Sequence, residues 1–351
     1  MMNYSTLRVG VLCWLEGDGL ASRIAGTLEA LGCGKTIQFL HQERVPDDLD
    51  IVLAHGPLGS MVPLANQLLS YPPSQRPALA LWMTEQFPAY GLPEWVRYGV
   101  GAVRSRAERL AFHKNAQQQW QLNRCLRLLT TRLSRFRYYG DLFWLSRVGV
   151  LSVLATTSKY IAEFLKVRGF DPVVAYIGFH PDWGGNLELE RDIPVLWLAT
   201  IRTRRQRRIL NKIRAELRAR GIEILVIDGI ENPYVFGDER TVILNRAKVV
   251  MNILRKKSDN NAVRFCLAAP NHALVVTEPT LPHTPFRSGV HLVEAEIERM
   301  ADTICYYLTH EEERKRITEQ AYQFVTTELT MREGVIRILE KAVAVRDNQR
   351  Q

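Results

Sequence analysis

The stretch from Arg240 to Leu308 alternates helical segments with short β-branched runs, and this alternation most constrains the fold. We predict, in order, a helix over 240–248, a strand at VVMNI, a helix over 260–269, a strand at ALVVTEP and a helix over 294–308. Helices that alternate with strands in this way indicate a parallel sheet. Ligands of such sheets bind beyond the carboxyl ends of the strands.

The rest of the chain predicts a second α/β unit. Strands are expected at LRVGVLCWL, DIVLAHG and ALALWMTEQ, and a further strand and a capped helix at GVLSVLATTSKYIAEFLKVRG. From about 104 to 145 the chain is basic, and Leu122, Leu126, Leu129 and Leu133 recur at helical spacing. We predict an α/β domain over 1–175, a second over 176–328, and a C-terminal helix and tail over 329–351. The polar residues after Val345 are expected to fray.

Composition places the chain among globular proteins, with 46% hydrophobic and 24% charged residues over 351 positions. The early apolar run VGVLCWL is closed by Glu16, and we interpret it as a first strand. Five scattered cysteines without CxxC spacing favour neither a disulfide framework nor a zinc site, and they suit the cytoplasm. The net charge of +9 suits a nucleotide, an anionic membrane surface or a nucleic acid.

A basic helix is predicted over 202–220, directly after the strand DIPVLWLAT. Its start would aim backbone N–H groups and guanidinium groups at the carboxyl end of that strand, an arrangement that holds phosphates. Arg204 and Arg205 are our candidates for phosphate contacts, and Arg202 is an alternative to either. The competing interpretation is that these arginines form a solvated basic face of the helix. This interpretation must apply to most arginines of the segment, because they cannot all face one ligand.

Three further positions are candidate ligand contacts. Arg264 lies near the start of an apolar helix, where a cation opposes the helix dipole unless an anion is close. Glu278 closes a strand, where a carboxylate can accept hydrogen bonds from a ribose or pair with an arginine. Asn252 ends a strand and either lines a ligand pocket or caps the structure.

In the first domain Asp18, His55, Glu85 and Gln86 follow predicted strands and should share one sheet edge. A substrate and a general base would be expected there. His55 and Glu85 are the candidate catalytic proton acceptors, and Asp18 and Gln86 are acceptor-side candidates. His55 and Glu85 are alternatively ordinary loop residues with satisfied hydrogen bonds.

Three local patterns do not support other chemistry. GCGKT over 32–36 lacks the first P-loop glycine, and GDGLAS lacks the third glycine of a dinucleotide fingerprint. Asp48 and Asp50 precede a strand, whereas a metal site of a parallel sheet needs carboxylates at a strand's end. We therefore expect no metal and no cofactor.

The segments NRAKVVMNI and VRFCLAAPNHALVVTEP resemble the donor-binding half of GT-B glycosyltransferases, especially the branch that includes CgeB-like proteins. That branch carries Arg-x-x-Glu at the helix start and Ser/Thr-Asp/Glu at the end of the next strand. Arg264, Thr277 and Glu278 match, and Leu267 stands in place of the helix Glu. The resemblance covers roughly 150–324. It implies two Rossmann-like parallel-sheet domains facing a central cleft, and a basic pair facing the donor diphosphate.

The resemblance implies a metal-independent glycosyltransferase that uses a nucleotide diphospho-sugar and an acceptor that the sequence does not identify. Arginines and a helix N-terminus would stabilise the leaving group in place of a metal. Leu267 favours an alternative, a GT-B-shaped binding or assembly protein without turnover. Basic segments at 104–147 and 202–220 favour a polyanion or anionic-membrane binder, although no nucleic-acid module is recognisable. The oligomeric state is left open.

Overall fold

The computed structural model describes residues 4–84, 92–114, 120–122, 124–255, 262–280 and 284–350. The chain divides into two compact units, which are described separately. Unit 1 comprises residues 1–175 and 334–351, and unit 2 comprises residues 176–333.

Unit 1 is built on a six-stranded parallel sheet with the strand order β2-β1-β3-β4-β7-β8. The strands are β1 (Arg8–Cys13), β2 (Lys35–Leu40), β3 (Ile51–Gly56), β4 (Ala78–Met83), β7 (Leu151–Thr156) and β8 (Val173–Val174). Every residue of β3 and β4 is buried, as expected for central strands of a sheet that is covered on both faces. The edge strand β2 is largely exposed or half-buried, which explains why hydrophobic patterning did not indicate it.

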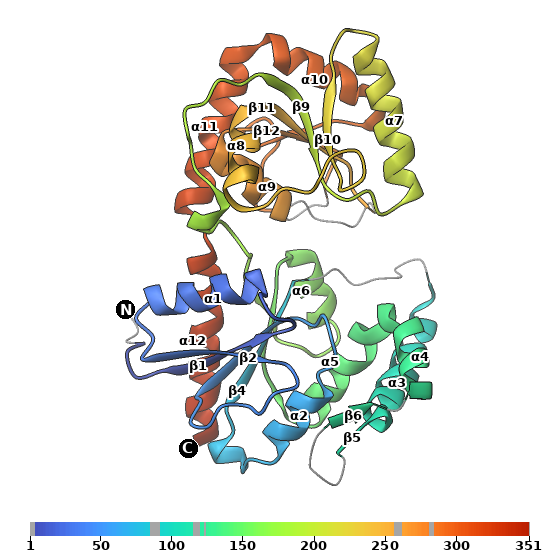
Figure 1. Ribbon diagram of the computed structural model, residues 1–351. Coiled ribbons are helices and arrows are strands. Elements are labelled where there is room, and N and C mark those ends of the chain that lie inside the picture. Colours follow the sequence, from blue (N-terminus) through green and yellow to red (C-terminus); the bar gives the residue numbers. More distant parts are fainter. Residues whose placement is uncertain are drawn as a thin grey trace. The chain divides into compact units, whose positions relative to one another are not determined.

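Helices cover both faces of this sheet (Figure 1). Those before β7 are α1 (Gly19–Ala30), α2 (Val62–Leu69), α3 (Glu94–Ala111), α4 (Arg124–Arg132) and α5 (Arg137–Arg147), with 3₁₀ turns η1 (Pro73–Gln75) and η2 (Ser134–Phe136). The later ones are α6 (Lys159–Lys166) and α12 (Met331–Arg350), whose residues from 334 onward belong to this unit. Side chains of α2, α5 and α6 share one hydrophobic cluster with the strands.

Two expectations for unit 1 were wrong. Leu122 does not continue a helix, because β5 (Phe112–Lys114) and β6 (Trp120–Leu122) form an antiparallel pair between α3 and α4. The chain also does not fray after Val345, because α12 extends to Arg350. Arg346 on this helix lies 3.3 Å from the buried carboxylate of Asp50, and this ion pair gives the polar end of the helix a partner.

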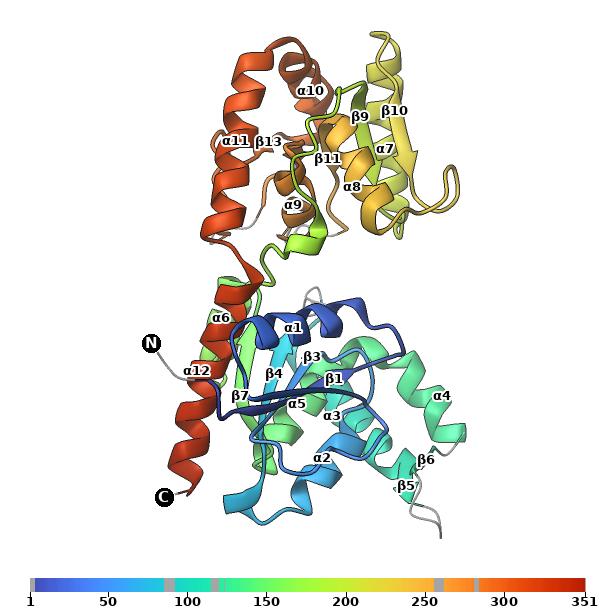
Figure 2. The same ribbon diagram turned by 60° about the vertical axis from the view of Figure 1, so that its left-hand side comes forward.

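Unit 2 is built on a five-stranded parallel sheet with the order β10-β9-β11-β12-β13. The strands are β9 (Ile193–Leu198), β10 (Ile224–Ile227), β11 (Ala247–Asn252), β12 (Leu274–Thr277) and β13 (Val293–Glu294). The helices are α7 (Arg204–Arg218), α8 (Gly237–Arg246), α9 (Ala262–Ala268), α10 (Met300–Thr309) and α11 (Glu311–Thr327), with 3₁₀ turns η3 (Pro181–Trp183), η4 (Ala269–Asn271) and η5 (Ile297–Arg299). Figure 2 shows this arrangement from a second side.

Side chains of α7 and α10 share a hydrophobic cluster with the strands of unit 2. The predicted fold class, two Rossmann-like parallel-sheet domains of the α/β type, is confirmed. The helix expected from Glu294 begins later, because Val293 and Glu294 form the edge strand β13 beside β12.

We predict that Asp50→Ala lowers the stability of unit 1 by about 1.5–3 kcal/mol, because this buried carboxylate accepts hydrogen bonds from Arg8 and pairs with Arg346. Urea unfolding followed by tryptophan fluorescence measures the change. Asp47→Ala is the control, since its ion pair with Arg44 is exposed and should contribute about 0.5 kcal/mol or less. Equal effects of the two substitutions would contradict the role of Asp50.

Candidate functional site

The carboxyl ends of β11 and β12 carry polar side chains that are linked to one another. Asn252 and Thr277 are the last residues of these strands, and each is at most 2% exposed. The Asn252 amide Nδ2 donates a 3.0 Å hydrogen bond to Thr277 Oγ1, and Asn252 Oδ1 accepts one from Arg264 Nη1. The Arg264 guanidinium lies 5.5 Å from the ring centroid of Trp197. Three of the predicted donor-binding residues therefore form one network in unit 2.

Arg205 and Glu278, also predicted as donor-binding residues, form an ion pair with each other. Arg205 Nη1 donates a 3.0 Å bond to Glu278 Oε2, and Arg205 Nη2 bonds to the other carboxylate oxygen. The backbone of Leu254 binds both residues, since its N–H donates to Glu278 Oε2 at 2.7 Å and its carbonyl accepts from Arg205 at 2.9 Å. The hydrogen bond with Glu278 raises the pKa of Arg205. The pair therefore joins the start of α7 to the ends of β11 and β12.

The N-terminus of α7 is capped by residues that our sequence analysis did not single out. Thr203 accepts a hydrogen bond from the N–H of Gln206 at 3.1 Å. The buried Gln206 side chain accepts from the N–H of Arg202 at 3.3 Å and donates to the carbonyl of Ile253 at 3.1 Å. The pattern Thr-x-x-Gln is a capping-box signature and was the available signal. Arg202 and Arg204 are exposed beside this helix end.

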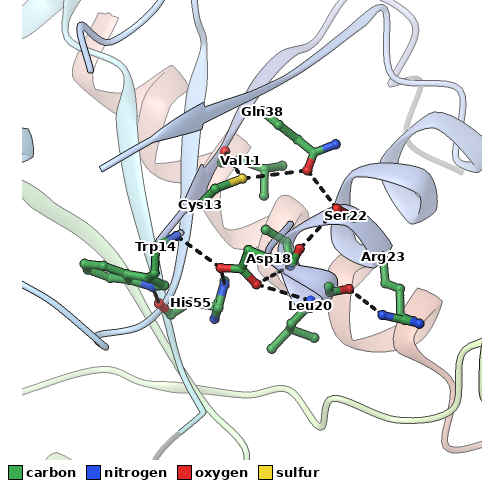
Figure 3. A network of polar contacts seen from close by, with 11 residues as sticks. Val11, Cys13, Trp14, Asp18, Leu20, Ser22, Arg23, Gln38 and His55 are labelled. Carbon is green, nitrogen blue, oxygen red and sulfur yellow. Dashed lines mark hydrogen bonds and ion pairs between the residues drawn. The ribbon is translucent and has the colours of Figure 1, made fainter. Parts of the chain in front are cut away.

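In unit 1 a second polar network surrounds Asp18, the N-cap of α1 (Figure 3). Asp18 Oδ1 accepts hydrogen bonds from the N–H groups of Leu20 and Ala21, both at 3.2 Å. Asp18 Oδ2 accepts from the N–H of Trp14 at 3.1 Å and lies 2.9 Å from His55 Nε2. Two of the predicted acceptor-side and catalytic residues therefore contact each other directly.

The electrostatics of this pair are set by the carboxylate. Burial acts to raise the pKa of Asp18, but hydrogen bonds from His55 and from the Trp14 amide outweigh burial and hold the pKa at about 2. His55 is 2% exposed, and its Nδ1 has no hydrogen-bond partner among the described residues. Because a carboxylate can only accept, His55 donates to Asp18 through Nε2–H.

The other positions singled out in the sequence lie outside these two networks or outside the described residues. Glu85 and Gln86 lie outside the described residues. Leu267 lies half-buried on α9, and its carbonyl accepts a 2.7 Å hydrogen bond from Asn271. Asp50 has the structural role described above, and Asp48 has a left-handed backbone with φ of 62°.

The described parts of the chain contain neither a cluster of metal ligands nor a membrane-spanning helix. In residues 4–84, 92–114, 120–122, 124–255, 262–280 and 284–350, no three His, Cys, Asp or Glu side chains gather as metal ligands would. Over the same residues, no helix combines the length and apolar character that crossing a bilayer requires.

Comparisons with known proteins agree with this architecture. A family model described as "Glycosyl transferase-like" matches residues 201–340. No curated protein matches the sequence. Among solved structures, HepE of Anabaena, determined with UDP and glucose, is similar with a TM-score of 0.58 and 11% identity, over 96% of this chain and 100% of HepE.

Two further solved structures are similar over most of this chain. WaaG, a glycosyltransferase involved in lipopolysaccharide biosynthesis, has a TM-score of 0.53 and 15% identity, over 96% of this chain and 99% of WaaG. The pneumococcal O-GlcNAc transferase GtfA, determined with UDP and GlcNAc, has a TM-score of 0.54 and 11% identity, over 84% of this chain. The chain spans only 57% of GtfA and 54% of TarM, which is similar with a TM-score of 0.52.

That the chain belongs to the CgeB-like branch stays a prediction. The likeness to GT-B glycosyltransferases rests on the family match and on the two parallel sheets. The chain therefore has the GT-B fold, and its residues 201–340 match the glycosyl transferase-like family model.

Proposed function

We propose that the chain is a glycosyltransferase that takes a sugar from a nucleotide diphospho-sugar. The observation that carries the proposal is the linked set Arg205, Asn252, Arg264, Thr277 and Glu278 at the carboxyl edge of the unit 2 sheet, inside the family match. Ligands of parallel sheets bind at this edge. UDP or a UDP-sugar is bound in the structures of HepE and GtfA, and this supports the same donor class here.

Positive charge at this edge would stabilise the diphosphate leaving group. Arg264 is held by Asn252, so its position is fixed before a ligand arrives. The N-terminus of α7 adds its dipole and the exposed Arg202 and Arg204. We propose on this basis that transfer needs no metal and no cofactor, because fixed cations and helix N–H groups do what Mg²⁺ does elsewhere.

Glu278 would accept hydrogen bonds from donor hydroxyl groups. Its carboxylate is held by Arg205 and by the amide of Leu254, and this fixes its orientation. Arg205 thus has two possible partners, the carboxylate in this structure and a donor phosphate. We propose that Arg205 positions Glu278 and adds to the positive charge around the phosphates.

In unit 1 the burial of His55 favours a positioning role. A ring that is 2% exposed gives an acceptor hydroxyl no direct access, whereas its bond to Asp18 fixes the start of α1. We propose that the Asp18–His55 pair shapes the acceptor side. Glu85 is then the proposed proton acceptor, with Gln86 beside it in the sequence.

Contact with an anionic membrane is a further proposal, supported by the outer face of α3. Trp95, Val103 and Leu110 are 78%, 58% and 64% exposed, and their spacing puts them on one side of the helix. Arg106 is also exposed on this helix. Exposed apolar residues beside basic ones are typical of helices that lie on membranes. Free thiols at Cys13, Cys33, Cys266 and Cys305 suit the cytoplasm, where we propose that the chain acts.

We predict that Arg264→Ala weakens binding of the nucleotide sugar by about 1.5–3 kcal/mol, because it removes a charge-assisted phosphate contact. The ligand is the one of UDP-, ADP- and GDP-glucose that raises the thermal midpoint most, and titration calorimetry measures its affinity. Arg208→Ala, an exposed arginine of α7, is the matched control. Equal affinities of the Arg264 variant and the wild type would remove the donor site from this edge.

We predict that EDTA leaves binding of the same nucleotide sugar unchanged. The proposed phosphate contacts come from arginines and helix N–H groups, which chelation does not affect. Calorimetry with and without EDTA checks this, and a loss of affinity that Mg²⁺ or Mn²⁺ restores would refute metal independence.

Because Leu267 stands where the resembled family has a Glu, the chain is either an enzyme or a binding protein without turnover. The following measurements distinguish the two. If Glu278 alone supplies the polar donor contact, we expect Glu278→Gln to weaken nucleotide-sugar binding by about tenfold, the effect of losing about 1.4 kcal/mol. Leu267→Glu should leave binding unchanged or improve it. Slow hydrolysis of the donor, followed by chromatography over long incubation, should be detectable for the wild type. Nucleotide binding with no hydrolysis or transfer would favour the binding protein.

A further inference from the structure

Unit 2 contains a cavity at the opposite edge of its sheet from the proposed donor site. The cavity has a volume of about 370 Å³ and is lined by Leu189, Glu190, Arg191, Lys248, His272, Glu311, Arg314, Lys315 and Thr318. Arg191 precedes β9, Lys248 is the second residue of β11, and His272 precedes β12. These positions mark the amino ends of parallel strands. Lys248 and Asn252 are four positions apart along the strand, a distance of about 13 Å.

Residues of the α11 helix line the other side of this cavity. The rings of His272 and Tyr322 stack with centroids 4.4 Å apart, and this contact holds α11 against the strand ends. Glu311, Arg314, Lys315 and Thr318 all lie in the first two or three turns of the helix. The N-terminal end of the helix dipole adds positive potential here.

Cations outnumber carboxylates in the lining by four to two, with His272 counted as neutral. Arg191 is fixed by hydrogen bonds to the carbonyls of Ala247 at 2.7 Å and Asn271 at 2.9 Å. The buried Arg314 donates to the carbonyl of Tyr307 at 2.8 Å, and its guanidinium lies 3.8 Å from Glu311. Neutral carbonyls orient both guanidinium groups but supply no compensating charge.

The nearby carboxylates pair with other groups of the lining, and among the described residues none forms an ion pair with Arg191: Glu312 lies 3.9 Å from Lys315, and Glu319 lies 3.6 Å from His272. Glu190 is exposed, and Glu311 forms its shorter ion pair, at 3.1 Å, with Lys315. Burial and the neighbouring Arg314 lower the pKa of Arg191 to about 10, and burial lowers the pKa of Arg314. A doubly charged anion in the cavity would relieve the repulsion between the two arginines.

We propose that this cavity binds a phosphoryl group of a small soluble molecule. Arg191 and Arg314 would form the fixed base of the site, and Lys248 and Lys315 the movable cations at its rim. Guanidinium groups suit phosphate because their N–H donors match its oxygens in pairs. The volume lies at the lower end of the range for small-molecule sites and admits a phosphorylated metabolite of sugar size.

The test uses the full chain and inorganic phosphate as the probe. Phosphate should raise the thermal midpoint of the wild type, and chloride at equal ionic strength should not. In the variant Lys248→Ala/Lys315→Ala the phosphate affinity should fall by about tenfold or more, as expected when charge-assisted contacts are lost. Arg208→Ala/Lys212→Ala, which removes two exposed positive charges of α7, is the charge-matched control.

Two further measurements distinguish phosphate binding in this cavity from binding at the donor site and from binding of a lipid headgroup. Phosphate should still bind to Arg264→Ala, because Arg264 lies at the other edge of the sheet, and the NMR signals of the His272 ring should shift on phosphate addition in both backgrounds. Loss of the phosphate effect in Arg264→Ala, or an equal effect of chloride, would overturn the proposal. Retention on phosphatidic acid vesicles that Lys248→Ala/Lys315→Ala abolishes would overturn the small-molecule assignment in favour of a lipid headgroup.

Discussion

The arrangement of the segments at the carboxyl edge of the unit 2 sheet depends on the burial of one carboxylate, that of Glu278. A carboxylate that is only 7% exposed needs partners to offset its loss of hydration. Arg205 provides two hydrogen bonds and the Leu254 amide provides a third. These partners come from the start of α7 and from the residues after β11. The requirement to satisfy Glu278 therefore brings three segments together and aligns the N-terminus of α7 with the strand ends.

The same parallel sheet presents different chemistry at its two edges. At the carboxyl edge, acidic and amide groups accompany the arginines, so a ligand there meets hydrogen-bond donors and acceptors together. At the amino edge, the arginines are oriented by backbone carbonyls and the lining is mainly cationic. The first environment suits a ligand with both hydroxyl groups and phosphates. The second suits a compact anion.

The sequence predicted the fold well where strands are buried, and the strands that it missed in the two parallel sheets lie at sheet edges. β3, β4 and β11 appear as continuous apolar runs because both faces of these strands are covered. The edge strands β2 and β13 were missed, since edge strands need no continuous apolar run and β13 has only two residues. The basic segment before α4 was assigned to a helix because its leucines fit helical spacing, whereas pairing between β5 and β6 decides its structure.

The residues of the candidate site could be predicted from the sequence, but the hydrogen bonds between them could not. Parallel strands place Asn252, Thr277 and Glu278 at one edge, so their type and position in the sequence sufficed to select them. That Arg205 pairs with Glu278, 73 positions away, depends on where α7 begins relative to β12, which spacing along the chain does not reveal.

The Asp18–His55 pair shows how a hydrogen bond between two side chains restricts the roles that they can take. With the pKa of Asp18 at about 2, the carboxylate stays charged across the physiological range and holds the N–H of His55 Nε2. The other ring nitrogen, Nδ1, is buried and has no hydrogen-bond partner among the described residues. An unsatisfied buried polar atom costs about 1–3 kcal/mol. The hydrogen bond to Asp18 thus fixes both the His55 ring and the start of α1, which supports the positioning role that we propose for the pair on the acceptor side.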